Sequence, residues 1–136
     1  MKILIETGRL ADQAVDALVI YGFADSELSG AAQVLDEALG GALKDLMDSG
    51  DFSGKAGQVA VLYPRGVIPT RRVLAVGLGP TDQLTVDIIR QVAAQAVQKA
   101  SELKARTMAS ALIGTDGIPA AEGAEAVAEG ALLGLY

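Results

Sequence analysis

The 136-residue chain contains no cysteine, no histidine and no tryptophan, and its aromatic residues are only three tyrosines and two phenylalanines. Without cysteine it cannot form a disulfide, which fits a reducing compartment. Without histidine or cysteine it can build neither a Ser-His-Asp nor a Cys-His nucleophile system, and no zinc site with those common ligands. Any catalysis would therefore depend on carboxylates, lysine, tyrosine or backbone groups.

Positive charge is also scarce, because 11 Lys and Arg residues face 17 Asp and Glu residues, for a net charge of −6. Binding to nucleic acid requires clustered Lys and Arg, so the acidic excess argues against such a partner. A local basic patch around Arg65, Arg71 and Arg72 is conceivable, and we interpret it as a solvated rim.

Long apolar runs are missing as well, so no segment reaches the length that spans a membrane. Residues 1–6 are too short and too soon charged to be a signal peptide. We therefore expect a cytoplasmic protein without membrane contact. Its length and its 51% hydrophobic content predict one folded domain over residues 1–136, with a core of aliphatic side chains.

Five apolar runs predict strands, at residues 2–6, 16–21, 58–63, 72–78 and 107–113. The second and fourth are nearly continuous, which is typical of strands covered on both faces. Helices are predicted over residues 29–48, over residues 85–105 and from residue 120 onward.

Capping and periodicity define these helices further. Two adjacent glycines cost about 1 kcal/mol each inside a helix, so Gly40 and Gly41 should divide the first helix in two. Ser29 and Thr85 are the expected N-caps. Apolar stripes are predicted in the last two helices, namely Val86, Ile89, Val92, Ala96, Ala100 and Leu103 in one and Ala124, Val127, Ala131 and Leu135 in the other.

The connections predict the topology. Residues 64–70 form a link too short for a parallel crossover, so the strands on either side of it should be antiparallel. The strands at 72–78 and 107–113 flank a full helix and should be parallel, with a right-handed crossover. We expect a three-layer α/β/α domain around a mixed, mostly parallel sheet of about five to six strands.

Two glycine-containing segments resemble phosphate-binding loops. Gly77 and Gly79 follow a strand, but Asp82 stands where a dinucleotide-binding fingerprint needs its third glycine, so we favour a tight turn. Ser29 and Gly30 open a helix, yet the acidic residues Asp25 and Glu27 come just before them. A structural cap explains that segment better than an anion site.

Two acidic clusters could suggest cation sites. Asp45, Asp48 and Asp51 have Lys44 and Lys55 nearby and lack the spacing of a calcium loop, so we interpret them as a solvated helix end. The final helix carries a second group, which we expect on its exposed side: Glu122, Glu125 and Glu129.

The loop at residues 52–57 resists a purely local explanation. Phe52 should insert into the core, while Lys55 could face another domain or subunit. The last helix lacks a stop signal, which favours a fragment of a longer protein. In that case an apolar patch should be exposed near Leu132, Leu133 and Tyr136.

Taken together, several segments make the chain resemble the N-terminal domain of the leucyl aminopeptidase family, the M17 cytosolic metallopeptidases. The resemblance rests on the order and spacing of residues 16–19, 28–41, 52–57, 72–79 and 129–136. It implies a parent with a separate C-terminal catalytic domain, two divalent metals (zinc or manganese) in that domain, and assembly into a hexamer. The family's signature Asn-Thr-Asp-Ala-Glu-Gly-Arg-Leu does not occur here, so no catalytic, cofactor-binding or metal residue can be assigned to this chain.

The same fold also resembles the macro domain, which binds ADP-ribose. Residues 15–19 are similar to its Asp-Ala-Ile-Val strand, and residues 28–32 stand where its glycine-rich loop lies. However, residues 20–23 replace its Asn-Ala-Ala-Asn and residues 7–9 replace its Gly-Asp-Ile. We expect an accessory aminopeptidase domain, with an ADP-ribose or nucleotide-binding module as the alternative and DNA binding as a third, weaker option.

Overall fold

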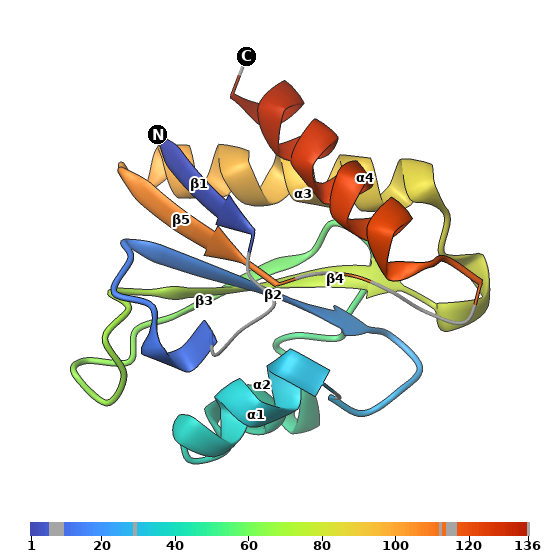
Figure 1. Cartoon of the computed structure of the whole chain (residues 1–136). Helices are drawn as coiled ribbons and strands as arrows, with labels where there is room; N and C mark the ends of the chain where they lie inside the picture. Colours follow the sequence, from blue (N-terminus) through green and yellow to red (C-terminus); the bar gives the residue numbers. More distant parts are fainter. Residues whose placement is uncertain (6–9, 29, 112, 114–116, 136) are drawn as a thin grey trace.

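The computed structural model describes residues 1–5, 10–28, 30–111, 113 and 117–135. Their centre is a five-stranded sheet in the order β1-β5-β2-β4-β3 (Figure 1). The strands are β1 (Lys2–Ile5), β2 (Ala17–Phe23), β3 (Val59–Leu62), β4 (Val73–Gly79) and β5 (Thr107–Ser110). Each predicted strand is therefore present, with ends shifted by a few residues.

Helices cover both faces of this sheet, as Figure 1 shows. On one face lie α1 (Gly30–Ala38) and α2 (Ala42–Ser49), and on the other lie α3 (Val86–Glu102) and α4 (Ala120–Gly134). Short 3-10 helices are η1 (Leu10–Asp12) and η2 (Thr81–Gln83). The predicted three-layer α/β/α architecture is confirmed.

Glycine ends the first helix where the sequence predicted. Gly40 and Gly41 have φ angles of +69° and +86°, a conformation that glycine adopts at little cost. At the start of α3, the hydroxyl oxygen of Thr85 accepts a hydrogen bond from the N–H of Ile88 at 3.2 Å, so Thr85 is the cap as predicted. The other predicted cap, Ser29, lies outside the described residues.

The pairing directions also agree with the prediction. Strands β3 and β4 are antiparallel, and β4 and β5 both run parallel to β2. However, β2 lies between β4 and β5, so these two strands do not pair directly. A helical crossover makes this possible because α3 carries the chain past β2 before the next strand begins.

Side chains alternate across the sheet and divide the core in two. Ala17, Val19, Leu74 and Val76 join the cluster with α3 and α4. Leu18, Ile20, Val73 and Ala75 join the cluster with α1 and α2. Every residue of β4 is buried, which explains its nearly continuous apolar sequence.

The buried face of α4 differs from the predicted stripe. Val127 and Ala131 are buried, but Ala124 is half-buried and Leu135 is 38% exposed. The helix instead buries its small residues, which are Gly123, Ala126, Val127, Gly130 and Ala131. The reason is the close approach of α4 to the backbone of α3, which glycine permits and a larger side chain prevents.

Candidate functional site at the carboxyl ends of the strands

The carboxyl ends of β2 and β4 are the place where open α/β sheets usually bind ligands. Here three separate segments meet at that edge. The N–H of Ala24, just after β2, donates to the carbonyl oxygen of Gly79 at 2.9 Å. The N–H of Gly79 in turn donates to the carbonyl oxygen of Gly54 at 2.8 Å. The edge is thus closed by backbone hydrogen bonds between the loop after β2, the end of β4 and the segment before β3.

Asp25, which follows β2, accepts hydrogen bonds from Thr81, which follows β4. Its Oδ1 accepts a hydrogen bond from the N–H of Thr81 at 3.0 Å and another from the Thr81 hydroxyl at 2.6 Å. These two bonds, the one from the hydroxyl foremost, lower the pKa of the Asp25 carboxyl. A negative side chain therefore occupies the backbone N–H and the hydroxyl of Thr81, so neither is available to a bound anion at this place.

The glycines near this edge serve close packing. A Cβ on Gly54, whose φ is +81°, would lie 2.6 Å from the carbonyl oxygen of Phe23. A Cβ on Gly77 would collide with the carbonyl oxygen of Lys55. Gly79 has a φ of +79°, which confirms the predicted tight turn. The backbone that approaches Gly54 and Gly77 belongs to the same chain, so close packing explains these two glycines without a phosphate.

Tyr21 is a titratable residue that the sequence analysis did not single out. Its hydroxyl lies 3.1 Å from Ser110 Oγ, and the Ser110 hydroxyl donates to the carbonyl oxygen of Ala111 at 3.0 Å. Because that bond uses the serine proton, the Tyr21 hydroxyl is the donor in the pair. Burial raises the pKa of Tyr21 to about 12, so it stays protonated at neutral pH and cannot act as a base.

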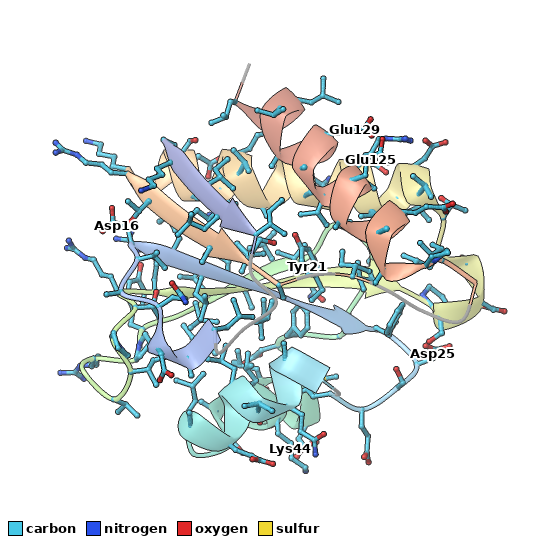
Figure 2. All side chains as sticks on the ribbon, in the orientation of Figure 1. Asp16, Tyr21, Asp25, Lys44, Glu125 and Glu129 are labelled. Atoms are coloured by element: carbon cyan, nitrogen blue, oxygen red, sulfur yellow. The ribbon has the colours of Figure 1, made fainter. Side chains whose placement is uncertain are left out.

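Asp16 lies at the opposite end of β2 from Asp25 (Figure 2). Its Oδ2 accepts hydrogen bonds from the N–H groups of Arg106 at 2.7 Å and Thr107 at 3.3 Å. The N–H of Asp16 donates to the Thr107 hydroxyl at 2.9 Å. The bond from Arg106 is the main cause of a lowered pKa at Asp16. This residue joins the start of β5 to β2 and acts in the fold.

A pocket of about 470 Å³ lies between the loop at residues 27–28 and helices α1 and α2. Its ionisable lining is Lys44 and four carboxyl groups, namely Glu27, Asp36, Glu37 and Asp48. Lys44 Nζ lies 2.9 Å from Asp48 Oδ2, and that contact is the main cause of the raised pKa of Lys44. This balance of charge disfavours an anionic ligand.

One of those carboxylates has a structural partner that explains its burial. Asp36 is 7% exposed. Its Oδ1 accepts a hydrogen bond from the backbone N–H of Leu43 at 2.7 Å, and its Oδ2 accepts one from the backbone N–H of Lys44 at 3.2 Å. Asp36, in α1, therefore caps the amino end of α2, where Gly41 offers no side chain. The sequence analysis missed this because the cap comes from the preceding helix.

The predicted acidic clusters lie on the surface, with one exception. Asp45, Asp48 and Asp51 are exposed, as expected of a solvated helix end. Within the described ranges, no three His, Cys, Asp or Glu side chains are grouped so that they could hold a metal ion. Glu129 corrects the prediction for α4: it is half-buried, and its Oε2 lies 3.2 Å from Arg90 Nε of α3.

Arg72 contradicts the interpretation of Arg65, Arg71 and Arg72 as a solvated rim. Arg72 is only 8% exposed, and its Nη1 donates a hydrogen bond to the carbonyl oxygen of Asp16 at 3.2 Å. Asp16 is 56 positions earlier in the chain, so this contact depends on the tertiary structure and not on the neighbouring sequence. Arg65 and Arg71 remain exposed.

The loop at residues 52–57 behaves partly as predicted. Phe52 is 1% exposed, which confirms that it inserts into the core. Lys55 is exposed, and its expected contact with another domain or subunit stays a prediction. The predicted apolar patch on α4 is exposed at Leu132 and Leu133, by 58% and 66%. Tyr136 lies outside the described residues.

The described helices include none that is both long and apolar enough to cross a membrane. Comparison with protein families gives a match over residues 18–136 to the cytosol aminopeptidase family, N-terminal domain. A probable cytosol aminopeptidase of Roseiflexus castenholzii is 38% identical over the whole chain. The chain spans about a quarter of that relative's length, 26%.

Solved structures of enzymes and of macrodomains both align with this chain. A mutant of tomato leucine aminopeptidase aligns with all of this chain and 28% of its own, with a TM-score of 0.78 and 28% identity. The bottromycin maturation enzyme BotP in complex with Mn aligns with 90% of this chain and 23% of its own, with a TM-score of 0.67 and 30% identity. The macrodomain of Thermus aquaticus DarG shares the fold, with a TM-score of 0.73 over 96% of this chain and 90% of its own, at 17% identity.

Proposed function

We propose a non-catalytic, accessory role for this chain, which belongs to the cytosol aminopeptidase family as an N-terminal domain. The observation that carries the proposal is the family match over residues 18–136, combined with coverage of only 26% of the Roseiflexus relative. Residues 1–136 then form one domain of a longer cytoplasmic aminopeptidase. The remaining part of that parent removes amino acids from the amino ends of peptides.

The side chains of the described residues are consistent with a domain that leaves metal binding and catalysis to the rest of the parent. Among them, no three His, Cys, Asp or Glu side chains are grouped to hold a metal ion. We propose that the two divalent ions expected for the family are held by the parent's catalytic domain. In this proposal those ions are zinc or manganese, and the BotP structure with Mn supports the second choice. The residues of this chain hold the fold together and present surfaces to the rest of the parent.

The exposed end of α4 supports a packing role. Leu132 and Leu133 are apolar side chains that expose 58% and 66% of their surface to water. Adjacent exposed apolar side chains often mark a surface that another protein unit covers. We propose that they contact the catalytic domain of the parent, that the parent assembles as a hexamer, and that this domain contributes to assembly or to control of substrate access.

The test of the accessory role is a peptidase assay on the purified chain. With a leucine amide substrate and either Zn²⁺ or Mn²⁺, we expect no hydrolysis above that of the metal and buffer alone. A cytosol aminopeptidase of full length, assayed in parallel, is the positive control. Hydrolysis that co-purifies with the folded chain would contradict the proposal.

A second candidate function is binding of ADP-ribose, which the shared fold with the DarG macrodomain favours. The Asp25 carboxylate opposes it, because it occupies both donors of Thr81 at the carboxyl ends of the strands and its negative charge repels a diphosphate there. We therefore expect calorimetry to detect no binding tighter than about 0.1 mM, roughly −5.5 kcal/mol. Tighter binding, abolished by a substitution at this edge, would make the nucleotide-binding function the better one.

A further inference from the structure

Strand β3 forms an edge of the sheet and, among the strands described here, pairs with β4 alone. The N–H of Gly77 donates to the carbonyl oxygen of Gln58 at 2.8 Å. Since residues in an antiparallel ladder alternate, this bond directs the N–H and C=O of Ala60 toward β4 and those of Val59 and Val61 away from it. In the described part of the chain, no backbone hydrogen bond outside the β3–β4 ladder involves Val59 or Val61.

This edge lacks the features that usually keep two sheets apart. Residues 58–62 contain no charged residue and no proline. Next to the strand, Tyr63 and Val67 expose 57% and 66% of their surface. The opposite edge, β1, differs because it carries Lys2 and contacts α4. Of the two sheet edges that the described residues form, β3 is therefore the uncharged one.

We propose that β3 is a contact between two copies of this chain, in which the two β3 strands pair antiparallel about a two-fold axis at Ala60. In this register Val59 of one copy lies opposite Val61 of the other, and each exchanges both of its backbone hydrogen bonds with its partner. The two sheets then continue into each other. This contact uses other residues than Leu132 and Leu133 of α4, which we proposed above for packing against the catalytic domain.

The strand is complementary to itself in this register. Ala60 faces Ala60 in a pair without hydrogen bonds, where the two side chains come closest and small residues fit best. Val59 and Val61 form cross-strand pairs of branched side chains on one face. No like charges oppose each other within residues 58–62.

A second copy suits this edge better than a flexible peptide does. Within β3, Val59 and Val61 are the residues that direct backbone groups away from β4, so any added strand gains few hydrogen bonds from this strand. A free peptide must lose its chain entropy to form them. The β3 strand of another copy is already held extended by its own β4, so it loses much less.

Opposite charges at the symmetry axis test this pairing. Ala60→Lys and Ala60→Glu each place like charges against each other, so each variant alone should dimerise at least about tenfold more weakly than the unaltered chain. An equal mixture of the two should regain the dimer, because Lys then faces Glu. The measurement is sedimentation velocity from about 5 µM to about 500 µM. Ala121→Lys and Ala121→Glu, at an exposed position of α4, carry the same charges away from β3 and should leave the dimer unchanged. Because Ala60 is half-buried against the core, circular dichroism first establishes that its two variants are folded.

Hydrogen exchange on the unaltered chain provides a test that does not depend on variants folding. Raising the concentration should slow exchange at the amides of Val59 and Val61, while those of Ala60 and Leu62, bonded to β4, stay protected throughout. A chain that is monomeric over the whole range would overturn the proposal. So would a dimer that neither protects Val59 and Val61 nor responds to charge at Ala60.

Discussion

Gly130 of α4 lies against the carbonyl oxygen of Arg90 in α3, with no room for a Cβ atom between them. The neighbouring residue continues the contact, because Glu129 Oε2 lies 3.2 Å from Arg90 Nε. One turn further on, a Cβ on Gly134 would lie 2.6 Å from the carbonyl oxygen of Ala94. The two helices thus meet backbone to backbone, and glycine sets their separation.

Gly130→Ala should destabilise the domain by about 1–3 kcal/mol, although alanine is the better helix former. The added methyl group must push α4 away from α3 and loosen the packing around it. Denaturant unfolding monitored by circular dichroism measures the change. Gly117→Ala is the control, since a Cβ there meets no atom within 4 Å. Equal stability of the two variants would contradict the close contact.

Asp36→Ala should cost about 1 kcal/mol, because the amides of Leu43 and Lys44 lose the carboxylate that caps α2. Asp36→Asn keeps one oxygen at this place and should recover part of the loss. The neighbouring Glu37 is exposed, so Glu37→Ala should leave the unfolding free energy within about 0.5 kcal/mol. If the alanine variants at 36 and 37 unfold alike, Asp36 is not a cap.

Stability should fall at high pH because of Tyr21. Its pKa is about 12 in the folded state, compared with about 10 in an unfolded chain. The folded state therefore holds the proton more tightly, and this contribution is complete below pH 10 and is lost as the pH rises toward 12. Melting temperatures across this window should decline less in Tyr21→Phe than in the unaltered chain. Parallel declines would show that Tyr21 does not titrate abnormally.

Asp25→Ala should lower the melting temperature at neutral pH by removing both hydrogen bonds to Thr81. The pKa of Asp25 is lowered in the folded state, so its contribution is present above about pH 4 and is lost as the pH falls below that. The variant and the unaltered chain should thus converge in acid. Asp82 is an exposed carboxylate beside Thr81, and Asp82→Ala is the control. It should leave the melting temperature unchanged at both neutral and acid pH. A difference that persists in acid would assign the effect to something other than the charge.

Local sequence was sufficient to predict the helices and strands. The break at Gly40 and Gly41, the cap at Thr85 and the buried run of β4 depend on neighbours within a few residues, so pattern and propensity predict them. The antiparallel link between β3 and β4 follows from its short length. These features are local, and nothing elsewhere in the fold overrides them.

The candidate site was much less predictable, because its contacts join distant residues. Asp25 and Thr81 are 56 positions apart, and Tyr21 and Ser110 are 89 apart. Arg72 was expected in solvent, but the carbonyl oxygen of Asp16 draws it inward. For α4, the apolar period predicted Leu135 in the buried stripe, whereas contact with α3 selected the glycines.

By itself, then, the chain's sequence determined its α/β class, the helix break at Gly40 and Gly41, the cap at Thr85 and the family to which it belongs, since these depend on short-range pattern and on the order of segments. Only the tertiary structure decided that the Asp25 carboxylate accepts both hydrogen bonds from Thr81 at the strand ends. It also decided that α3 and α4 touch through glycine, and that Val59 and Val61 lie at an edge of the sheet. Each of these depends on which distant backbone groups the folded chain brings within hydrogen-bonding distance, and hydrophobic periodicity carries no information about such distances.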